Sequence, residues 1–323
     1  MKIKEKVSVV IPYYNDSQVF ERCLMSVLTQ TESPYEVIII DDNSNDSDEV
    51  QNMLKKYVKN NIKYIRNEFN KNAAYSRNLG VCVSEGSVIA FIDADDYWKS
   101  THLENALNIL MTKDVDFVYS NVIEVDAFGD ELKRKVNDIR LLENPYDIIL
   151  ESPPQTGSFV FYKNKMGSIK FNERLRRHQD FQFLIDIIKN NKKHYYINTY
   201  DTYYCESHRP FSSRVNFDSI FEFWNEYYQL FSLNKLNVFL LRNLCLSLRI
   251  KNSQSIKYYS KKYQVFDTLQ NTFFFKVYRM VGEEHLASKI ILFFSFHLVY
   301  NIKNIPFLIQ KKLSRVVRKV FRK

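Results

Sequence analysis

Three carboxylates, Asp93, Asp95 and Asp96, follow a short apolar run in the first third of the chain. The run covers residues 88–92 and begins shortly after Gly86, a pattern that predicts a strand buried on both faces of a sheet. Ligands of open α/β sheets bind at the carboxyl ends of such strands. Asp93 and Asp95 are two residues apart, so on extended backbone both side chains would project from the same side.

Two carboxylates held so close together repel each other unless a positive charge lies between them. Hard divalent cations such as Mg²⁺ and Mn²⁺ take oxygen ligands of this kind and share them with phosphate groups. The pattern therefore suggests a metal and phosphate site at Asp93 and Asp95. A solvated acidic turn that merely ends the strand is the alternative, because Asp-x-Asp alone is a weak motif.

The composition argues against several classes of protein. The 323 residues include only six glycines, and neither a dinucleotide fingerprint nor a P-loop is present. The four cysteines lie far apart, which argues against a zinc site or a disulfide framework and fits a reducing compartment. The N-terminus does not resemble a signal peptide, and the near-apolar run 290–300 is too short to span a membrane. We therefore expect a cytoplasmic protein.

The net charge of +9 belongs to the end of the chain. Residues 301–323 contain eight Lys or Arg and no acid, which leaves the remaining chain near +1. Within 311–323 the apolar residues fall on one helical face and basic residues occupy the rest, a pattern typical of a helix lying on an anionic membrane. Nucleic-acid binding is the alternative for a basic tail, but the apolar face argues against it, so we expect no nucleic-acid partner.

Apolar periodicity predicts strands that alternate with helices in the first part of the chain, at residues 7–11, 37–40, 62–65, 88–92 and 117–119. This alternation predicts a parallel, doubly wound α/β sheet. Three of these strands end in polar clusters, at residues 13–15, 41–42 and 93–96, and the crossover rule places those ends on one edge of the sheet. Long aromatic helical segments begin near 217, so we place a domain boundary near 215.

Two clusters could support a nucleotide at that edge. Asp41 or Asp42 could accept a hydrogen bond from the imide N–H of a uracil, although a turn followed by an Asp46 helix cap would use the same residues. Arg77, on a predicted helix at 73–83, could balance the charge of residues 93–96 and touch a diphosphate. An internal salt bridge that only supports the fold is the alternative for Arg77.

Two further clusters lie beyond residue 170. Asp180 opens a predicted helix at 180–189, where the helix dipole favours an anion, and a simple helix cap is the alternative. His208, Arg209 and Ser212 share a predicted loop and would suit phosphate or metal contact, whereas an isolated surface His is the more common outcome.

Taken in order, these motifs resemble the family 2 glycosyltransferases, which bind nucleotide sugars on the GT-A fold. The resemblance covers about residues 5–215 and rests on Val9-Val-Ile-Pro-Tyr-Tyr-Asn15, Asp41-Asp42-Asn-Ser-Asn-Asp46, Ser76-Arg77-Asn78-Leu-Gly80, Asp93-Ala-Asp95-Asp96 and Gln179-Asp180. It implies a GT-A doubly wound, mostly parallel sheet. Residues 1–215 would form the catalytic domain, and 216–323 a helical region with a basic membrane-associating tail.

The resemblance also implies a role for each matching residue. The nucleotide would be held by Pro12, Tyr13, Asp41 or Asp42, and Arg77. Asp93 would contact the ribose or the metal, Asp95 would ligate Mn²⁺ or Mg²⁺, and Asp180 would be the catalytic base. The loop that closes over the diphosphate would contain His208, Arg209 and Ser212. Two positions depart from the family pattern: Gln179 stands where Glu is usual, and His178 stands where Gly is common.

We therefore expect an inverting, metal-dependent transferase at the cytoplasmic face of a bacterial inner membrane. It would move a hexose, with glucose favoured over galactose, from a UDP-sugar to a GlcNAc- or GalNAc-diphosphoundecaprenol acceptor. The linkage would be β, with β-1,3 preferred, in O-antigen, lipopolysaccharide or capsule biosynthesis. A non-catalytic nucleotide-sugar-binding scaffold of the same fold is the main alternative. A nucleotidyltransferase fits less well, because no glycine-rich triphosphate loop is present.

Overall fold

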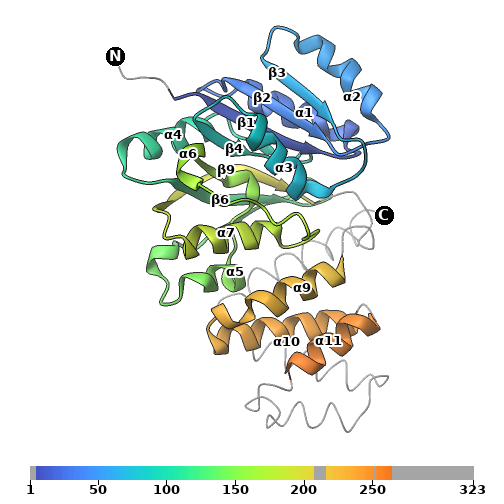
Figure 1. Cartoon of the computed structure of the whole chain (residues 1–323), viewed down its shortest axis with the longest axis vertical. Helices are drawn as coiled ribbons and strands as arrows, with labels where there is room; N and C mark the ends of the chain where they lie inside the picture. Colours follow the sequence, from blue (N-terminus) through green and yellow to red (C-terminus); the bar gives the residue numbers. More distant parts are fainter. Residues whose placement is uncertain (1–4, 207–215, 250–251, 264–323) are drawn as a thin grey trace. The chain divides into compact units, whose positions relative to one another are not determined.

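The structure is a computed structural model that describes residues 5–206, 216–249 and 252–263. It divides into two compact units, Met1–Leu230 and Phe231–Lys323 (Figure 1). The predictions for His208, Arg209 and Ser212, and for the basic tail at 311–323, lie outside the described residues.

The first unit is built on one mixed sheet. Its strands are β1 (Val7–Tyr13), β2 (Glu36–Asp41), β3 (Ile62–Arg66), β4 (Val88–Phe91), β5 (Tyr97–Trp98), β6 (Phe117–Val125), β7 (Glu131–Arg134), β8 (Val160–Tyr162) and β9 (His194–Cys205). They are ordered β3-β2-β1-β4-β8-β6-β9-β5, with β7 beside β6. The neighbours β3, β2, β1 and β4 are parallel, as are β6 and β9, whereas β5, β7 and β8 run antiparallel to their neighbours. The predicted strands are confirmed, and the polar ends of β1, β2 and β4 lie at one edge.

The helices connect these strands and continue into the second unit. They are α1 (Ser17–Leu28), α2 (Ser47–Leu54), α3 (Asn72–Val83), α4 (His102–Thr112), α5 (Ile148–Glu151), α6 (Lys163–Met166), α7 (Gln179–Lys189), α9 (Phe217–Tyr227), α10 (Leu233–Arg249) and α11 (Ser253–Tyr263). Asp46 does not cap α2 as expected. Its Oδ2 instead accepts from the Ser17 N–H at 2.9 Å and so satisfies a free donor at the start of α1.

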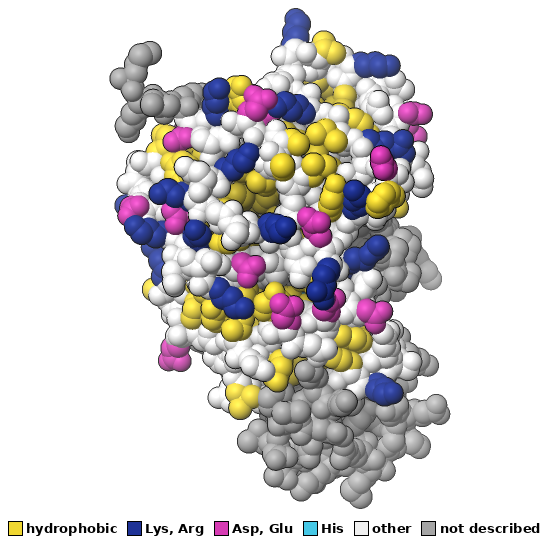
Figure 2. Space-filling model, in the orientation of Figure 1, with side chains coloured by type: hydrophobic (Ala, Val, Ile, Leu, Met, Phe, Trp, Pro, Cys, Tyr) yellow, Lys and Arg dark blue, Asp and Glu magenta, His cyan; other side chains and the backbone are white. Residues whose placement is uncertain are grey.

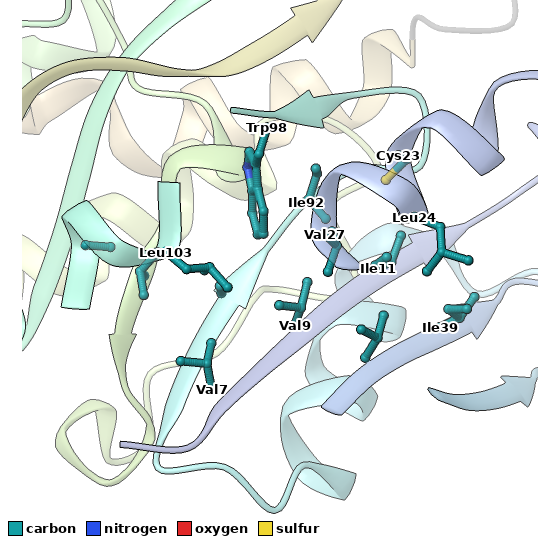
Figure 3. Packing of buried hydrophobic residues seen from close by; sticks show 14 of the residues in the cluster. Val7, Val9, Ile11, Cys23, Leu24, Val27, Ile39, Ile92, Trp98 and Leu103 are labelled. Atoms are coloured by element: carbon teal, nitrogen blue, oxygen red, sulfur yellow. The ribbon is translucent and has the colours of Figure 1, made fainter. Parts of the chain in front are cut away.

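One face of the sheet packs against α1 and α4. The odd-numbered residues of β1 point to this face, and Val9 and Ile11 join Cys23, Leu24 and Val27 of α1 in one buried cluster (Figure 3). On α4, Leu103 leads a buried stripe that repeats at helical spacing and enters the same cluster. Burial of this apolar surface fixes the register of β1, because a slip of one residue would turn every side chain to the other face.

The other face of the sheet packs against α3 and α7. Gly80 of α3 lies so close to Val10 that an added Cβ would be 2.3 Å from Val10 Cγ1, so the motif glycine allows close helix–sheet approach. Phe183 of α7 packs edge-on to Phe91 of β4, with ring centroids 6.3 Å apart. The sheet therefore lies between two helical layers. In the second of these layers, α3 and the start of α7 lie near the polar edge of the sheet.

Helix α9 belongs to the first unit, although we assigned residues 216–323 to the C-terminal region. It is attached through Ser219, whose Oγ accepts from the Arg176 N–H at 2.8 Å, and through an ion pair between Glu222 and Arg174. The second unit contains α10 and α11, which pack on each other. Leu236, Leu240 and Leu244 form the buried stripe of α10. Within the described ranges, no helix has both the length and the apolar character needed to cross a membrane.

Candidate active site

The carboxylates after β4 lie on a tight turn. Strand β4 ends at Phe91, and the Asp96 N–H donates to the Asp93 carbonyl oxygen at 3.1 Å, which closes a turn over 93–96. The expectation that Asp93 and Asp95 project from extended backbone is therefore wrong. Arg22 of α1 donates from Nη2 to the Asp95 carbonyl oxygen at 2.7 Å and anchors the turn from outside.

Arg77 joins this turn to the start of α7. Its Nη2 pairs with Asp93 Oδ1 at 2.5 Å, and its Nη1 donates to Gln179 Oε1 at 3.0 Å. The guanidinium is buried and lies over the ring of Phe171, 5.2 Å from its centroid. Gln179 thus supplies a hydrogen-bond acceptor for Arg77. The hydrogen bond between the two side chains therefore forms although Gln stands here in place of the usual Glu. This geometry is compatible with both roles considered for Arg77, contact with a diphosphate and an internal salt bridge that supports the fold, because the ion pair with Asp93 is internal and lies at the edge of the site.

Asp96 joins the turn to the end of β9. Its Oδ1 accepts from the Cys205 N–H at 2.8 Å, and its side chain is fully buried. Burial, followed by the negative charges of Asp95 and Asp93, raises the pKa of Asp96 well above its ordinary value. Asp96 therefore fixes the shape of the turn, whereas Asp93 and Asp95 are its partly exposed carboxylates.

Groups of the protein itself occupy the hydrogen-bonding positions of the Asp41 carboxylate. Oδ1 accepts from the Ser44 N–H at 2.9 Å, and Oδ2 accepts from the hydroxyls of Ser47 and Tyr64. Arg66 Nε lies 3.8 Å from the same Oδ2, and Asp41 has no exposed surface. This geometry leaves no lone pair of Asp41 accessible to a ligand.

Asp42 has a different set of contacts. Its carboxylate accepts three N–H groups of the loop that leads into α3: Asn67 Nδ2 at 2.8 Å and the backbone N–H groups of Lys71 and Asn72 at 2.7 Å each. A carboxylate offers about four acceptor positions, so one remains. Asp42 is also 4% exposed. Of the two candidates for binding a base, the geometry favours Asp42.

The two tyrosines at the end of β1 point in opposite directions. Tyr13 is 1% exposed and packs in the core against Phe20, with ring centroids 5.0 Å apart. Its ring cannot reach a nucleotide. Tyr14 is 36% exposed at the same strand end, and Pro12 is half-buried. The burial of Tyr13 could have been predicted from the alternation of side chains along the strand, because Tyr13 shares a face with Val9 and Ile11. The aromatic contact expected from Tyr13 is therefore available only from Tyr14.

Asp180 lies in the first turn of α7, half-buried. Burial raises the pKa of its carboxyl, opposed by the positive charges of Arg77 and Arg177 and by backbone N–H groups at the start of the helix. A raised pKa brings a carboxylate closer to the basicity that proton abstraction at neutral pH requires. Asp180 can therefore act as a base beside the Arg77 network.

His178 occupies a strained position before α7. Its φ is 64°, in the left-handed region that favours glycine, which gives a physical reason for the family's preference for Gly here. The imidazole stacks on Phe181 at 4.7 Å between centroids and meets Phe223 and Trp224 edge-on. Burial, assisted by the charge of Arg177, lowers the pKa of His178 to about 3, so the ring is neutral. Aromatic packing offsets the backbone strain and orients the start of α7.

The carboxylate turn fits a cation that is shared with a substrate. No group of three or more His, Cys, Asp or Glu side chains that could hold a metal occurs in the ranges 5–206, 216–249 and 252–263. Mg²⁺ is ordinarily bound by one or two carboxylates together with substrate phosphates, rather than by an all-protein cage. Asp95 and Asp93, partly exposed on one turn, could supply such a pair of oxygen ligands.

Some residues of this edge were not found from the sequence. Arg22 reaches the turn from 73 positions away and also donates to Cys205 Sγ at 3.3 Å, a contact that no local pattern predicts. Ser219, which holds the segment before α7, was missed for the same reason. Strand β9 did carry a signal, since 194–205 contains five Tyr and two Thr.

Polar loops at the ends of β1, β2 and β4, together with the carboxylate turn and the Arg77 network at the start of α7, define an α/β protein with a polar site at one edge of its sheet. The family model described as Glycosyl transferase family 2 matches residues 8–209, so the chain belongs to that family. The chain also resembles solved structures. The S. aureus TarS 1–349 structure in complex with UDP-GlcNAc is 21% identical, with a TM-score of 0.56, over 76% of this chain and 73% of TarS. The GT-A fold prediction is confirmed.

Two curated relatives illustrate the range of the family. The Escherichia coli UDP-Glc:alpha-D-GlcNAc-diphosphoundecaprenol beta-1,3-glucosyltransferase WfaP is 37% identical over 117 residues, 36% of this chain and 46% of WfaP. The Staphylococcus aureus (strain N315) poly(ribitol-phosphate) beta-N-acetylglucosaminyltransferase TarP is 32% identical over 209 residues, 62% of each chain. The chain thus spans between about half and two thirds of the length of these relatives.

Proposed function

We propose that this protein is an inverting glycosyltransferase that uses a UDP-sugar and a lipid-linked acceptor. The observation that carries the proposal is the Arg77 network. One guanidinium joins Asp93 of the carboxylate turn to Gln179, the residue before Asp180. The group that would face the donor diphosphate and the group that would activate the acceptor are thereby held by one rigid, buried side chain. Such preorganisation is what a displacement reaction requires.

The nucleotide would bind at the ends of β1 and β2. Asp42 would accept the imide N–H of uracil, and Tyr14 and Pro12 would offer apolar faces to the base. Support for a UDP-sugar comes from WfaP, which is named for UDP-Glc, and from the TarS complex with UDP-GlcNAc. Glucose is the favoured sugar and galactose the next.

In the transfer, Asp180 would take the proton of the acceptor hydroxyl as the hydroxyl oxygen attacks the anomeric carbon. The bond from that carbon to the diphosphate breaks, and its electron pair leaves with UDP. Attack opposite the leaving group converts an α-linked donor into a β-linked product. Asp95, with Asp93, would hold Mn²⁺ or Mg²⁺. When bound, the cation would supply positive charge to the departing diphosphate. Arg77 keeps Asp93 oriented during this step.

The acceptor would be a GlcNAc or GalNAc carried on undecaprenyl diphosphate, with a β-1,3 linkage formed in O-antigen, lipopolysaccharide or capsule biosynthesis. WfaP and WfgD, both of Escherichia coli, carry names that specify such an acceptor and linkage. An acceptor of this kind would place the protein peripherally at the cytoplasmic face of the inner membrane. The basic amphipathic segment 311–323 would provide the attachment, and it lies outside the described residues.

The test is UDP release by the purified protein with Mn²⁺, across a panel of UDP-sugars and with GlcNAc- or GalNAc-diphosphate-lipid analogues. Acceptor-dependent release with one donor, abolished by EDTA and restored by Mn²⁺, is the expected result. UDP binding with no turnover for any donor and acceptor pair would contradict catalysis and favour a binding scaffold. Turnover that persists in EDTA would contradict the assignment of a metal to Asp95.

A further inference from the structure

Two neighbouring arginines before α7 have no acidic partner among the residues that the structure describes. On the face drawn in Figure 2, basic and acidic side chains are interspersed. Arg174 follows that pattern and pairs with Glu222 of α9. Arg176 and Arg177 are exposed, and within the part of the chain that the structure describes neither guanidinium forms an ion pair or side-chain hydrogen bond. Two like charges on consecutive residues together favour an anion that both side chains can reach.

The backbone that carries these arginines is fixed at both ends. Ser219 Oγ accepts from the Arg176 N–H at 2.8 Å and from the Arg177 N–H at 3.0 Å. At the other end, Asn78 Nδ2 donates to the Phe171 carbonyl oxygen at 2.9 Å, and Asn72 Nδ2 donates to that of Glu173 at 2.8 Å. Because the segment is held by α3 and α9, its side chains need little backbone ordering when they bind a ligand.

The segment leads directly to Asp180. Arg177 lies three residues before it, and the positive charge of Arg177 lowers the pKa of both Asp180 and Tyr204. Tyr204 is near the end of β9 and is also influenced by Asp96 and Asp95. Arg177 is thus an exposed cation close in the chain to the proposed base. In the proposed acceptor, the sugar hydroxyl that meets Asp180 and the diphosphate on the anomeric carbon belong to the same sugar ring. The diphosphate would therefore lie within reach of side chains near Asp180.

We propose that Arg176 and Arg177 bind the diphosphate of the lipid-linked acceptor and so position its sugar hydroxyl at Asp180. This inference rests on the proposed function, because it names a subsite of the same reaction. A guanidinium presents a planar set of donors that matches two phosphate oxygens, and two adjacent guanidinium groups match a diphosphate. The donor diphosphate is the other source of the same chemistry, and the experiment must separate the two.

The experiment measures binding, so that it does not depend on turnover. The intact protein, preloaded with UDP, is titrated with a GlcNAc-α-diphosphate bearing a short alkyl chain. The matching alkyl glycoside of GlcNAc without phosphate serves as the second probe. The Arg176→Ala/Arg177→Ala double variant is compared with Arg174→Ala, which removes the same kind of charge from the same segment. Ser219→Ala tests the anchoring, and UDP affinity is measured for every variant.

The wild-type protein should bind the diphosphate probe more tightly than the phosphate-free probe. The double variant should lose about 100-fold in affinity for the diphosphate probe, about tenfold per arginine. Its affinity for the phosphate-free probe and for UDP should not change, Arg174→Ala should resemble wild type, and Ser219→Ala should show a smaller loss. Equal binding of the two probes by wild type, or an equal loss in Arg174→Ala, would overturn the inference. A loss confined to UDP would assign the arginines to the donor. Absence of turnover with intact diphosphate binding would count against the proposed function alone.

Discussion

Replacing Arg77 tests whether the network beneath the site is held together as the structure indicates. Arg77→Met keeps most of the side-chain length and its contact with the ring of Phe171 but removes the charge. Asp93 loses the partner that lies 2.5 Å from its Oδ1, and Gln179 Oε1 loses a donor at 3.0 Å. The expected result is a less stable first unit.

The magnitude follows from the burial of the two partners. Removing one member of a fully buried ion pair costs about 3–5 kcal/mol. The Asp93 side chain is 33% exposed, so water screens part of this loss, while the unmade bond to Gln179 adds about 1 kcal/mol. We expect the free energy of unfolding to fall by about 2–4 kcal/mol, which corresponds to a urea midpoint lower by about 1 M or more.

The fluorescence of the two tryptophans provides the assay. Trp98 and Trp224 are the only tryptophans of the chain and both lie in the first unit, so urea unfolding followed by fluorescence reports on that unit. Arg174→Met is the matched control, since it removes an exposed pair with Glu222 and should cost less than about 1 kcal/mol. Asp93→Asn and the double variant Arg77→Met/Asp93→Asn complete a mutant cycle.

The cycle can refute the reasoning. If Arg77 and Asp93 stabilise each other, the double variant should be more stable than the sum of the single losses predicts, by about 1–3 kcal/mol. Losses that add within about 0.5 kcal/mol would show that the two side chains are independent, and the account of a shared network would then be wrong.

Three further predictions concern the core, the entry to α7 and the base. Gly80→Ala should lower the free energy of unfolding by about 1–3 kcal/mol, because the new methyl group would overlap Val10; an unchanged urea midpoint would contradict the close approach. His178→Ala should be less stable than His178→Gly by about 1 kcal/mol, since both lose the aromatic stack but only glycine relieves the positive φ. The acid limb of the pH–rate profile should lie above the pKa near 4 of an ordinary Asp, because the Asp180 carboxyl must be ionised and its pKa is raised. Arg177→Gln should move that limb to still higher pH, since a positive charge that favours the carboxylate is removed; a limb that moves down would refute the assignment.

Local patterns in the sequence predicted most elements of the fold, and the crossover rule predicted that the polar ends of three strands share one edge of the sheet. Periodicity located α1, α4 and α7, because each buries one apolar stripe, whereas the buried face of α3 includes Ser76 and Arg77. The antiparallel strands β5 and β8 pair with segments far away in the sequence, and β7 forms a short hairpin with β6; the alternation of strands and helices does not predict the direction of any of these strands.

The site was predicted in its residue types more reliably than in its geometry. The positions of Asp93, Arg77 and Asp180 could be taken from motifs, because Asp93 follows a predictable strand, Asp180 opens a predictable helix, and Arg77 lies within the helix between two predictable strands. The choice between Asp41 and Asp42 could not be made from the motifs. It depends on how many hydrogen bonds each carboxylate already accepts, from Tyr64 in one case and from the loop before α3 in the other. The burial of Tyr13 was predictable, because alternation along β1 places it on the same face as Val9 and Ile11.

Asp180→Asn tests the central claim most directly. UDP release and UDP affinity would be measured together, with the donor and acceptor analogue that the wild-type protein uses. Because the pKa of Asp180 is raised, its ionised form costs stability at neutral pH, so the amide should not unfold the protein. We predict turnover lower by about 10²–10⁴-fold with unchanged UDP affinity. Turnover within a few-fold of wild type would contradict the assignment of Asp180 as the base.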